Sequence, residues 1–191
     1  MTPLANYTAC RGKGEGVGIQ GIHFLRQVLA VTVAIGLSAC AKAPPAGAPV
    51  AVSITPSKGE GATLNFSATY ADAQGAGNIK LAGVLINDVL NGANGCYVIY
   101  LRPSKILRLV EDVGIGSLPL PLDSQSKVEN SQCILYADGS SVTQSGNELT
   151  VKAAVTFKPK FSGTKDIYLY AENLYGGKTP LVPAKGSWVV P

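Results

Sequence analysis

The stretch LTVKAAVTF, residues 149–157, alternates apolar side chains with mostly polar ones more regularly than any other part of the chain. Successive side chains of a β-strand point to opposite faces of a sheet, so this pattern predicts a strand with one buried face. The stretch indicates an all-β fold class. The face predicted to be buried carries Leu149, Val151, Ala153, Val155 and Phe157.

Strand-like segments with turn residues between them continue on both sides of this stretch. In ATLNFSATY, residues 62–70, every second side chain from Leu64 to Tyr70 is apolar. Shorter strands are predicted at residues 50–55, 166–172 and 186–190. Asp, Asn, Ser and Gly recur between the segments and predict turns at residues 72–75, 91–92, 94–95, 138–139, 145–147 and 176–177.

The middle of the chain adds a hairpin and two segments of different pattern. Residues 95–101 and 106–110 flank the turn RPSK and predict a β-hairpin. Residues 79–90 have apolar side chains at helical spacing, but their Val and Ile content favours a strand, with a helix as the alternative. Residues 114–121, GIGSLPLP, are expected to form a loop. Many short strands with regular turns predict a β-sandwich over residues 50–191.

Composition favours one globular domain with extra segments, and it gives no sign of a nucleic-acid partner. The chain has 191 residues, of which 46% are hydrophobic and 15% charged, which suffices for an apolar core. The formal net charge is +4, and Lys and Arg are scattered rather than gathered in a basic block. Because a nucleic-acid-binding surface gathers its basic residues, we expect no such partner.

One long apolar run, VLAVTVAIGLSAC at residues 28–40, carries no charge and follows Arg26. It is too short to span a bilayer, which takes about 20 residues, and it suits the apolar region of a signal peptide. Its last four residues, Leu-Ser-Ala-Cys, resemble the lipobox of bacterial lipoproteins. In that family the cysteine, here Cys40, receives a diacylglycerol, and the peptide is cut just before it. An ordinary secretory signal and a buried apolar helix are the alternatives.

The lipobox resemblance implies a lipoprotein signal peptide over residues 1–39 and a lipid-anchored, Ala/Pro-rich tether over residues 40–49. Pro-rich composition favours an extended spacer between the lipid and a folded domain. The expected location is the bacterial cell envelope, and the family's enterobacterial sorting rule assigns a lipoprotein with Ala41 after the cysteine to the outer membrane. The region before the apolar run is longer than is usual in this family, so a start downstream of Met1 is the alternative.

The C-terminal part resembles the penultimate strand of an immunoglobulin-like or fibronectin-type-III-like domain. In residues 157–173 a turn leads into a strand with a tyrosine near its start, and a Gly-containing loop then leads to the final strand. The stretches LINDVLNGANGCYVIY, NSQC, SGNELTVKAAVTFKP and GTKDIYLYAEN also resemble an uncharacterised β-sandwich module of secreted bacterial proteins. This resemblance covers residues 50–191 and implies a fold without implying an activity.

Two of the four cysteines, Cys96 and Cys133, lie inside the predicted domain. In an oxidising compartment two thiols most simply form one disulfide, and two buried free thiols are the alternative. Neither a CxxC spacing nor a histidine accompanies them, which argues against a metal site.

The residues that enzymes and cofactors use are sparse. The single histidine, His23, lies in the predicted signal peptide, so the mature chain lacks Ser-His-Asp, Cys-His and histidine-zinc sites. The adjacent carboxylates Glu111 and Asp112 would point to opposite faces of a strand, and we interpret them as solvated rather than as a glycosidase pair. Asp72 is expected to bond its own backbone in a turn rather than to bind calcium. We therefore expect no cofactor, no metal and no enzyme activity.

Aromatic side chains are the remaining candidates for ligand contact. Tyr168 and Tyr170 share one face of their predicted strand, and Trp188 on the next strand would stand beside them if the register allowed. Trp188 itself is expected in the core. The predicted function is that of a lipid-anchored envelope protein with a non-enzymatic binding, adhesion or structural role, whose partners are the membrane and an unknown envelope protein or glycan. A surface carbohydrate-binding module that uses these aromatics is the alternative.

Overall fold

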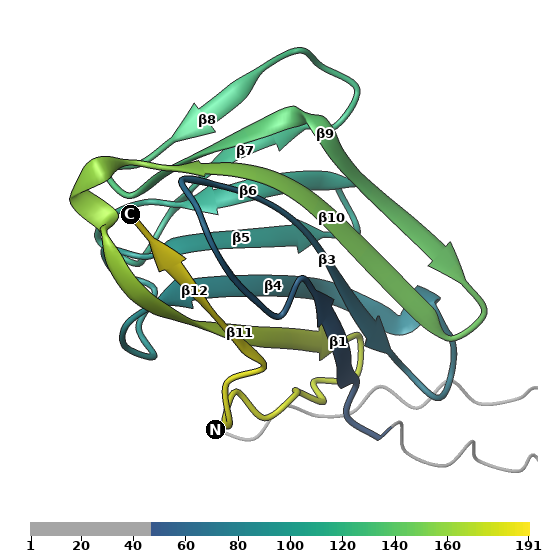
Figure 1. Ribbon diagram of the computed structural model, residues 1–191. Helices are drawn as coiled ribbons and strands as arrows, with labels where there is room; N and C mark the ends of the chain where they lie inside the picture. The colour runs from purple at the N-terminus through teal and green to yellow at the C-terminus, as the bar shows by residue number, and fades with distance from the viewer. Residues whose placement is uncertain (1–46) are drawn as a thin grey trace, which may run out of the picture. The chain divides into compact units, whose positions relative to one another are not determined.

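The computed structural model describes residues 47–191, which form two β-sheets packed face to face (Figure 1). The five-stranded sheet has the order β1-β3-β10-β9-β8, and the seven-stranded sheet has the order β2-β12-β11-β4-β5-β6-β7. The helical segments within this part of the chain are two short 3₁₀ turns, η1 (Ala76–Asn78) and η2 (Pro159–Phe161). The predicted all-β sandwich is confirmed.

The strands predicted from alternation are present, together with several that alternation did not reveal. Neighbouring strands pair antiparallel, except that β12 and β2 pair parallel. The strands of the five-stranded sheet are β1 (Val50–Thr55), β3 (Thr63–Ala71), β10 (Glu148–Phe157), β9 (Cys133–Ser145) and β8 (Lys127–Glu129). Those of the seven-stranded sheet are β2 (Lys58–Glu60), β12 (Gly186–Val190), β11 (Gly163–Asn173), β4 (Ile79–Asn87), β5 (Cys96–Leu101), β6 (Ile106–Val110) and β7 (Ser117–Pro121).

The core lies between the two sheets and is built from the side chains that the alternating patterns predict. The five apolar residues predicted to share the inner face of β10, from Leu149 to Phe157, are all buried. β3 pairs with β10 so that Ala68 lies opposite Val151 and Leu64 opposite Val155, which brings both apolar faces to the same side of the sheet. Burial of a large apolar side chain contributes about 1.5–3 kcal/mol, so this shared inner face is a main source of stability.

β4 lies in residues 79–90, the segment for which the sequence left a strand and a helix as alternatives. It lies between β11 and β5 in the seven-stranded sheet, so the expected strand is confirmed. Every residue from Ala82 to Asn87 is buried. On the outer face the ring of Tyr97 covers Gly83, where an added Cβ would stand 2.9 Å from the ring edge. A strand covered on both faces loses the alternation by which strands are identified in sequence.

Residues 138–139, where a turn was predicted, lie within strand β9. The pairing of β9 with β10 shifts register here, and residues 137–140 stand opposite Ala153 alone. Gly139 has a φ of 80°, a conformation that glycine adopts without strain. The predicted turn is therefore wrong, because a β-bulge occupies these residues and the strand continues beyond it.

The loop expected at residues 114–121 is also corrected. Gly114 and Gly116 have φ values of 76° and 79°, and after them Ser117–Pro121 pairs with β6 as strand β7. β7 is the edge strand of its sheet, where a proline without an N–H donor is tolerated. The prolines that suggested a loop mark an edge strand instead.

The predicted disulfide is confirmed, and it joins the two sheets. Cys96 opens β5 and Cys133 opens β9, with their Cα atoms 5.7 Å apart and both side chains buried. Tyr70 of β3 makes a second link across the interior, because its hydroxyl donates a hydrogen bond of 2.7 Å to the carbonyl of Gly83 in β4. The sheets are therefore held together by a covalent and a polar link as well as by apolar packing.

Candidate functional site

The three aromatics singled out from the sequence lie on two different faces of the seven-stranded sheet. β11 and β12 pair so that Trp188 stands opposite Lys165 on the inner face. Trp188 is 7% exposed, as expected for a core residue, and its indole N–H donates to the carbonyl of Gly61 at 2.9 Å. Tyr168 and Tyr170 share the outer face of β11, as the alternation predicts. The structure therefore brings the two tyrosines together and leaves Trp188 apart from them.

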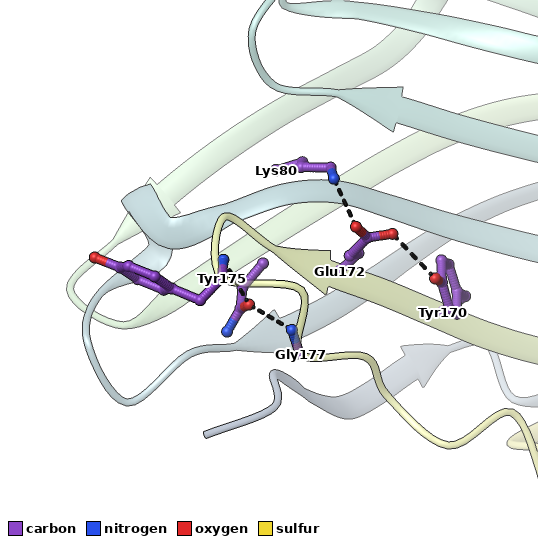
Figure 2. A network of polar contacts seen from close by, with 6 residues as sticks. Lys80, Tyr170, Glu172, Tyr175 and Gly177 are labelled. Carbon is purple, nitrogen blue, oxygen red and sulfur yellow. Dashed lines mark hydrogen bonds and ion pairs between the residues drawn. The ribbon is translucent and has the colours of Figure 1, made fainter. Parts of the chain in front are cut away.

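The outer tyrosines bond to carboxylates of their own strand. The hydroxyl of Tyr168 donates to Asp166 at 3.2 Å, and that of Tyr170 donates to Glu172 at 3.3 Å. Figure 2 shows Glu172 between Tyr170 and Lys80, whose ammonium forms an ion pair with it. The hydrogen bond from Lys80 lowers the pKa of Glu172, while burial and the nearby carboxylates raise the pKa of both phenols. Ligand contact by these tyrosines stays a prediction.

Other candidates from the sequence have protein partners or lie outside the described residues, as Cys40 does. Asp72 accepts hydrogen bonds from the backbone N–H of Gln74 at 2.9 Å and from Asn173 Nδ2 at 3.0 Å, which confirms the expected turn. Asp112 accepts one from the backbone N–H of Ser131 at 3.0 Å.

Residues 47–191 contain no group of three His, Cys, Asp or Glu side chains arranged to hold a metal ion. In the same part of the chain, no helix has the length and apolar character needed to cross a membrane.

A polar cleft of about 560 Å³ opens at one end of the sandwich. Three connections build its walls: the loop between β4 and β5, the turn between β8 and β9, and η2 between β10 and β11. In Figure 1 the β4–β5 loop and the η2 turn both lie at the left end of the domain. The lining residues are Asn87, Asp88, Val89, Asn91, Ala93, Asn94, Gln132, Lys160, Phe161 and Lys165.

Asn87 holds the β4–β5 loop in shape from the end of β4. Its Nδ2 donates to the carbonyl of Asn91 at 2.8 Å and to that of Ala93 at 3.3 Å, and its Oδ1 accepts from the backbone N–H of Asp88 at 3.0 Å. Asn91 Oδ1 in turn accepts from the backbone N–H of Ala93 at 2.9 Å. Because Asn87 is buried and its amide bonds the loop at three points, the loop is preorganised.

Asn130 fixes the opposite wall to the same scaffold. Its Nδ2 donates to the carbonyls of Gly95 and Val110, both at 3.0 Å. Its Oδ1 accepts from the backbone N–H groups of Gln132 and Cys133, both at 2.9 Å. Since Asn130 is buried and Cys133 carries the disulfide, the cleft stands on a rigid base.

Lys165 enters the cleft from the inner face of β11. Its side chain is 9% exposed, and its Nζ lies 3.6 Å from Asp88 Oδ2 and 4.6 Å from the centroid of the Phe161 ring. The first distance exceeds that of a hydrogen bond, and the second is a cation–π contact. Among the residues that the structure describes, no acceptor lies within hydrogen-bond distance of this ammonium.

Further polar groups at the cleft also have unused hydrogen-bonding capacity. Within the described part of the chain, the side chain of Asn94 and the ammonium of Lys160 make no hydrogen bond or ion pair, and Asn91 uses only its oxygen. Gln132 uses only its Nε2, which donates to Ser131 Oγ at 2.8 Å. The cleft therefore presents both donors and acceptors to an incoming molecule.

Sequence reasoning missed the cleft, although one signal for it was present. Lys165, Ile167, Leu169 and Ala171 alternate on one face of β11, so the same rule that identifies the strand places a lysine among apolar residues. Lysine is almost never fully buried unless it is paired, so its position was informative. Asn91 and Asn94 looked like ordinary turn residues, and nothing local distinguished them.

Comparisons with protein-family models, with curated proteins and with solved structures found no match for the chain. The role of the cleft is therefore inferred from its own geometry and chemistry.

Proposed function

We propose that the protein is a lipid-anchored component of the bacterial cell envelope that binds a ligand, without transforming it, in the cleft at the end of the sandwich. The observation that carries this proposal is the preorganised cleft itself. Its walls are fixed by the fully bonded amides of Asn87 and Asn130, while polar groups with unused capacity face its interior. Fixed walls with polar groups that can still form hydrogen bonds suit a binding site for a polar ligand.

The lining chemistry supports binding rather than catalysis. Asp88 is the single carboxylate that lines the cleft, and residues 47–191 contain no histidine. General acid–base chemistry commonly relies on a histidine or on a pair of carboxylates in defined geometry. A non-enzymatic role is therefore part of the proposal.

We also propose the immunoglobulin-like class for the domain, and the order of its strands supports this. The runs β1-β3-β10-β9 and β12-β11-β4-β5 match the orders A-B-E-D and G-F-C-C′ of immunoglobulin sheets. The disulfide departs from that pattern, because it joins β5 to β9 rather than the strands equivalent to B and F, which are β3 and β11.

The described chain enters the sandwich far from the cleft. The carbonyl of Gly47 accepts a hydrogen bond of 2.8 Å from Asn173, which ends β11, whereas Lys165 lies near the beginning of that strand. Eight residues of strand separate these two positions by about 26 Å. An anchor attached on the N-terminal side of Gly47 would therefore join the domain at a distance from the proposed binding site.

The proposal is tested by filling the cleft through substitution, in the mature protein extracted in detergent. Asn91→Trp places a large ring in the cleft, and Asn147→Trp places the same ring at the exposed turn between β9 and β10 as the control. We expect wild type and Asn147→Trp to be retained on at least one column from a panel of immobilised envelope polysaccharides, and Asn91→Trp to elute early. Equal retention of both variants, or no retention of wild type on any column, would contradict the proposal.

A second candidate is a carbohydrate-binding module that uses the outer face of the seven-stranded sheet. It is favoured by the register that puts Tyr168, Leu85 and Tyr97 side by side across β11, β4 and β5, with Tyr170 opposite Gly83. Sugar rings commonly stack on aromatic faces, and three tyrosines share this surface. If this candidate is right, Tyr170→Ala weakens retention on a polysaccharide column while Asn91→Trp does not.

A further inference from the structure

From the proposed function of the cleft, on which this step rests, we infer that its ligand is an acidic saccharide whose carboxylate binds the ammonium of Lys165. Three features of the cleft support this ligand class: the environment of Lys165, the net charge of the lining, and the hydrogen-bonding groups of the side chains that line it.

The Lys165 side chain is 9% exposed, and its ammonium is ion-paired with Asp88 but forms no hydrogen bond to the described residues. Its nearest carboxylate oxygen, on Asp88, is 3.6 Å away, and the side chain of Asp88 is 62% exposed. An incoming acceptor can therefore form hydrogen bonds to this ammonium that the described residues do not supply. A carboxylate supplies two oxygens and forms charge-assisted hydrogen bonds, which are about twice as strong as neutral ones.

The charge of the lining favours an anion. Lys160 and Lys165 contribute two positive charges, and Asp88 contributes one negative charge. Lys160 is exposed at the rim, on η2, and makes no ion pair within the described residues. The lining is therefore net positive, with one cation on a largely covered side chain and the other on an exposed one.

The other polar groups suit sugar hydroxyls. Asn91, Asn94 and Gln132 carry amide groups, which both donate and accept hydrogen bonds, as hydroxyl groups do. Large apolar side chains are few in the lining, because Phe161 is only 3% exposed beneath the Lys165 ammonium and Val89, at 55% exposed, is the other one. An acidic peptide would also match the lysines, but its backbone groups each only donate or only accept, whereas a sugar hydroxyl does both, as the side-chain amides of the cleft do. We therefore assign a polyhydroxylated ligand with a carboxylate, that is, a uronic-acid saccharide.

The test compares two ligands that differ only in the carboxylate. The mature protein in detergent is titrated calorimetrically with oligomers of galacturonic acid and with the same oligomers after reduction of the carboxyl groups to neutral alcohols. We expect the acidic oligomer to bind about tenfold or more tightly than the neutral one, which matches the usual contribution of a hydrogen bond to a charged group. Higher salt should weaken binding of the acidic oligomer only.

Two lysine variants and one control identify the group responsible. Lys165→Met keeps the apolar stem and removes the charge, and it should weaken the acidic oligomer about tenfold while leaving the neutral oligomer unchanged. Lys160→Gln, at an exposed position where folding is not at risk, should weaken the acidic oligomer about threefold. Lys152→Gln, on the exposed side of β10, should change neither.

The outcomes separate this inference from the proposed function. Equal affinity for both oligomers would overturn the inference and leave the cleft as a binding site. Retention on a polysaccharide column without binding of either oligomer would do the same, as would preference for a glutamate-rich peptide that depends on Lys165. Failure of wild type on every column would instead contradict the proposed function.

Discussion

Cys96 and Cys133 join the two sheets directly beside the cleft, since Asn130 bonds both the backbone N–H of Cys133 and the carbonyl of Gly95, the residue before Cys96. The covalent link and the buried amide thus fix the same three segments: the start of β5, the start of β9 and the turn before β9. Stability and the shape of the cleft therefore depend on the same contacts.

We predict that replacing both cysteines by alanine lowers the free energy of unfolding by about 4 kcal/mol, because the disulfide closes a loop of 37 residues in the unfolded chain. Urea unfolding of wild type and the double variant measures this loss. The double variant should also bind polysaccharide less tightly, because the base of the cleft loosens. Free thiols at Cys96 and Cys133, mapped by alkylation of denatured wild type without reductant, would contradict the prediction.

Trp188 gives a second prediction, about the core. Trp188→Ala should cost about 3–5 kcal/mol of stability, because it removes a buried ring and leaves a cavity. Trp188→Phe keeps most of the apolar contact and loses the hydrogen bond to Gly61, so it should cost less than Trp188→Ala. Thermal melts of both variants provide the measurement. A Trp188→Ala protein that melts as wild type does, but no longer binds polysaccharide, would show that the ring contacts ligand instead.

Stability should fall at alkaline pH because of buried phenols. Burial raises the pKa of Tyr97 from about 10 to about 12, and the pKa of the fully buried Tyr70 is raised in the same direction. A raised pKa means that the stabilising contribution is complete below about pH 10 and is lost as pH rises through the folded-state pKa. For Tyr97 alone, two pH units correspond to roughly 2–3 kcal/mol.

Urea unfolding at intervals from pH 9 to pH 12 checks this alkaline dependence. Tyr97→Phe should flatten the decline, whereas Tyr175→Phe, at a ring that is 67% exposed, serves as the control and should leave it unchanged. A decline that is identical in wild type and Tyr97→Phe would contradict the assignment to this phenol.

The lipid anchor is tested separately at Cys40. Because the diacylglycerol would be attached to this sulfur, Cys40→Ala should abolish incorporation of radiolabelled palmitate and release the protein from membrane fractions. Wild type, grown in parallel, should carry the label. A wild-type protein that incorporates no label would show that the LSAC sequence is not a lipobox.

The alternation of apolar and polar residues predicted most of the strands. It failed where a strand is covered on both faces and where a bulge interrupts a strand. β3, β10 and β12 have one buried and one exposed face, and their patterns were clear. β4 is covered on both faces, so its side chains carried a mixed signal. The bulge around Gly139 interrupts β9, and its Asp-Gly pair looked like a turn. In each case the deciding contact comes from another strand.

The cleft was less predictable, because its parts are far apart in the chain. Lys165 meets Asp88 across 77 residues, and Asn130 reaches Gly95 across 35. These contacts depend on which loops meet at one end of the sandwich, and no local pattern encodes that. The aromatics drew attention in the sequence because of their size, yet the register of β11 and β12 places Trp188 in the core and the two tyrosines outside.

The central claim is that ligand occupies the cleft, and amide hydrogen exchange of the mature protein with and without a retained polysaccharide tests it most directly. The account predicts slower exchange in residues 88–95, in residues 130–132 and in η2 when ligand is present, with no change in the loop of residues 174–185 at the opposite end. Slower exchange confined to β11 around Tyr168 and Tyr170, or to that opposite loop, with none in the cleft, would contradict it.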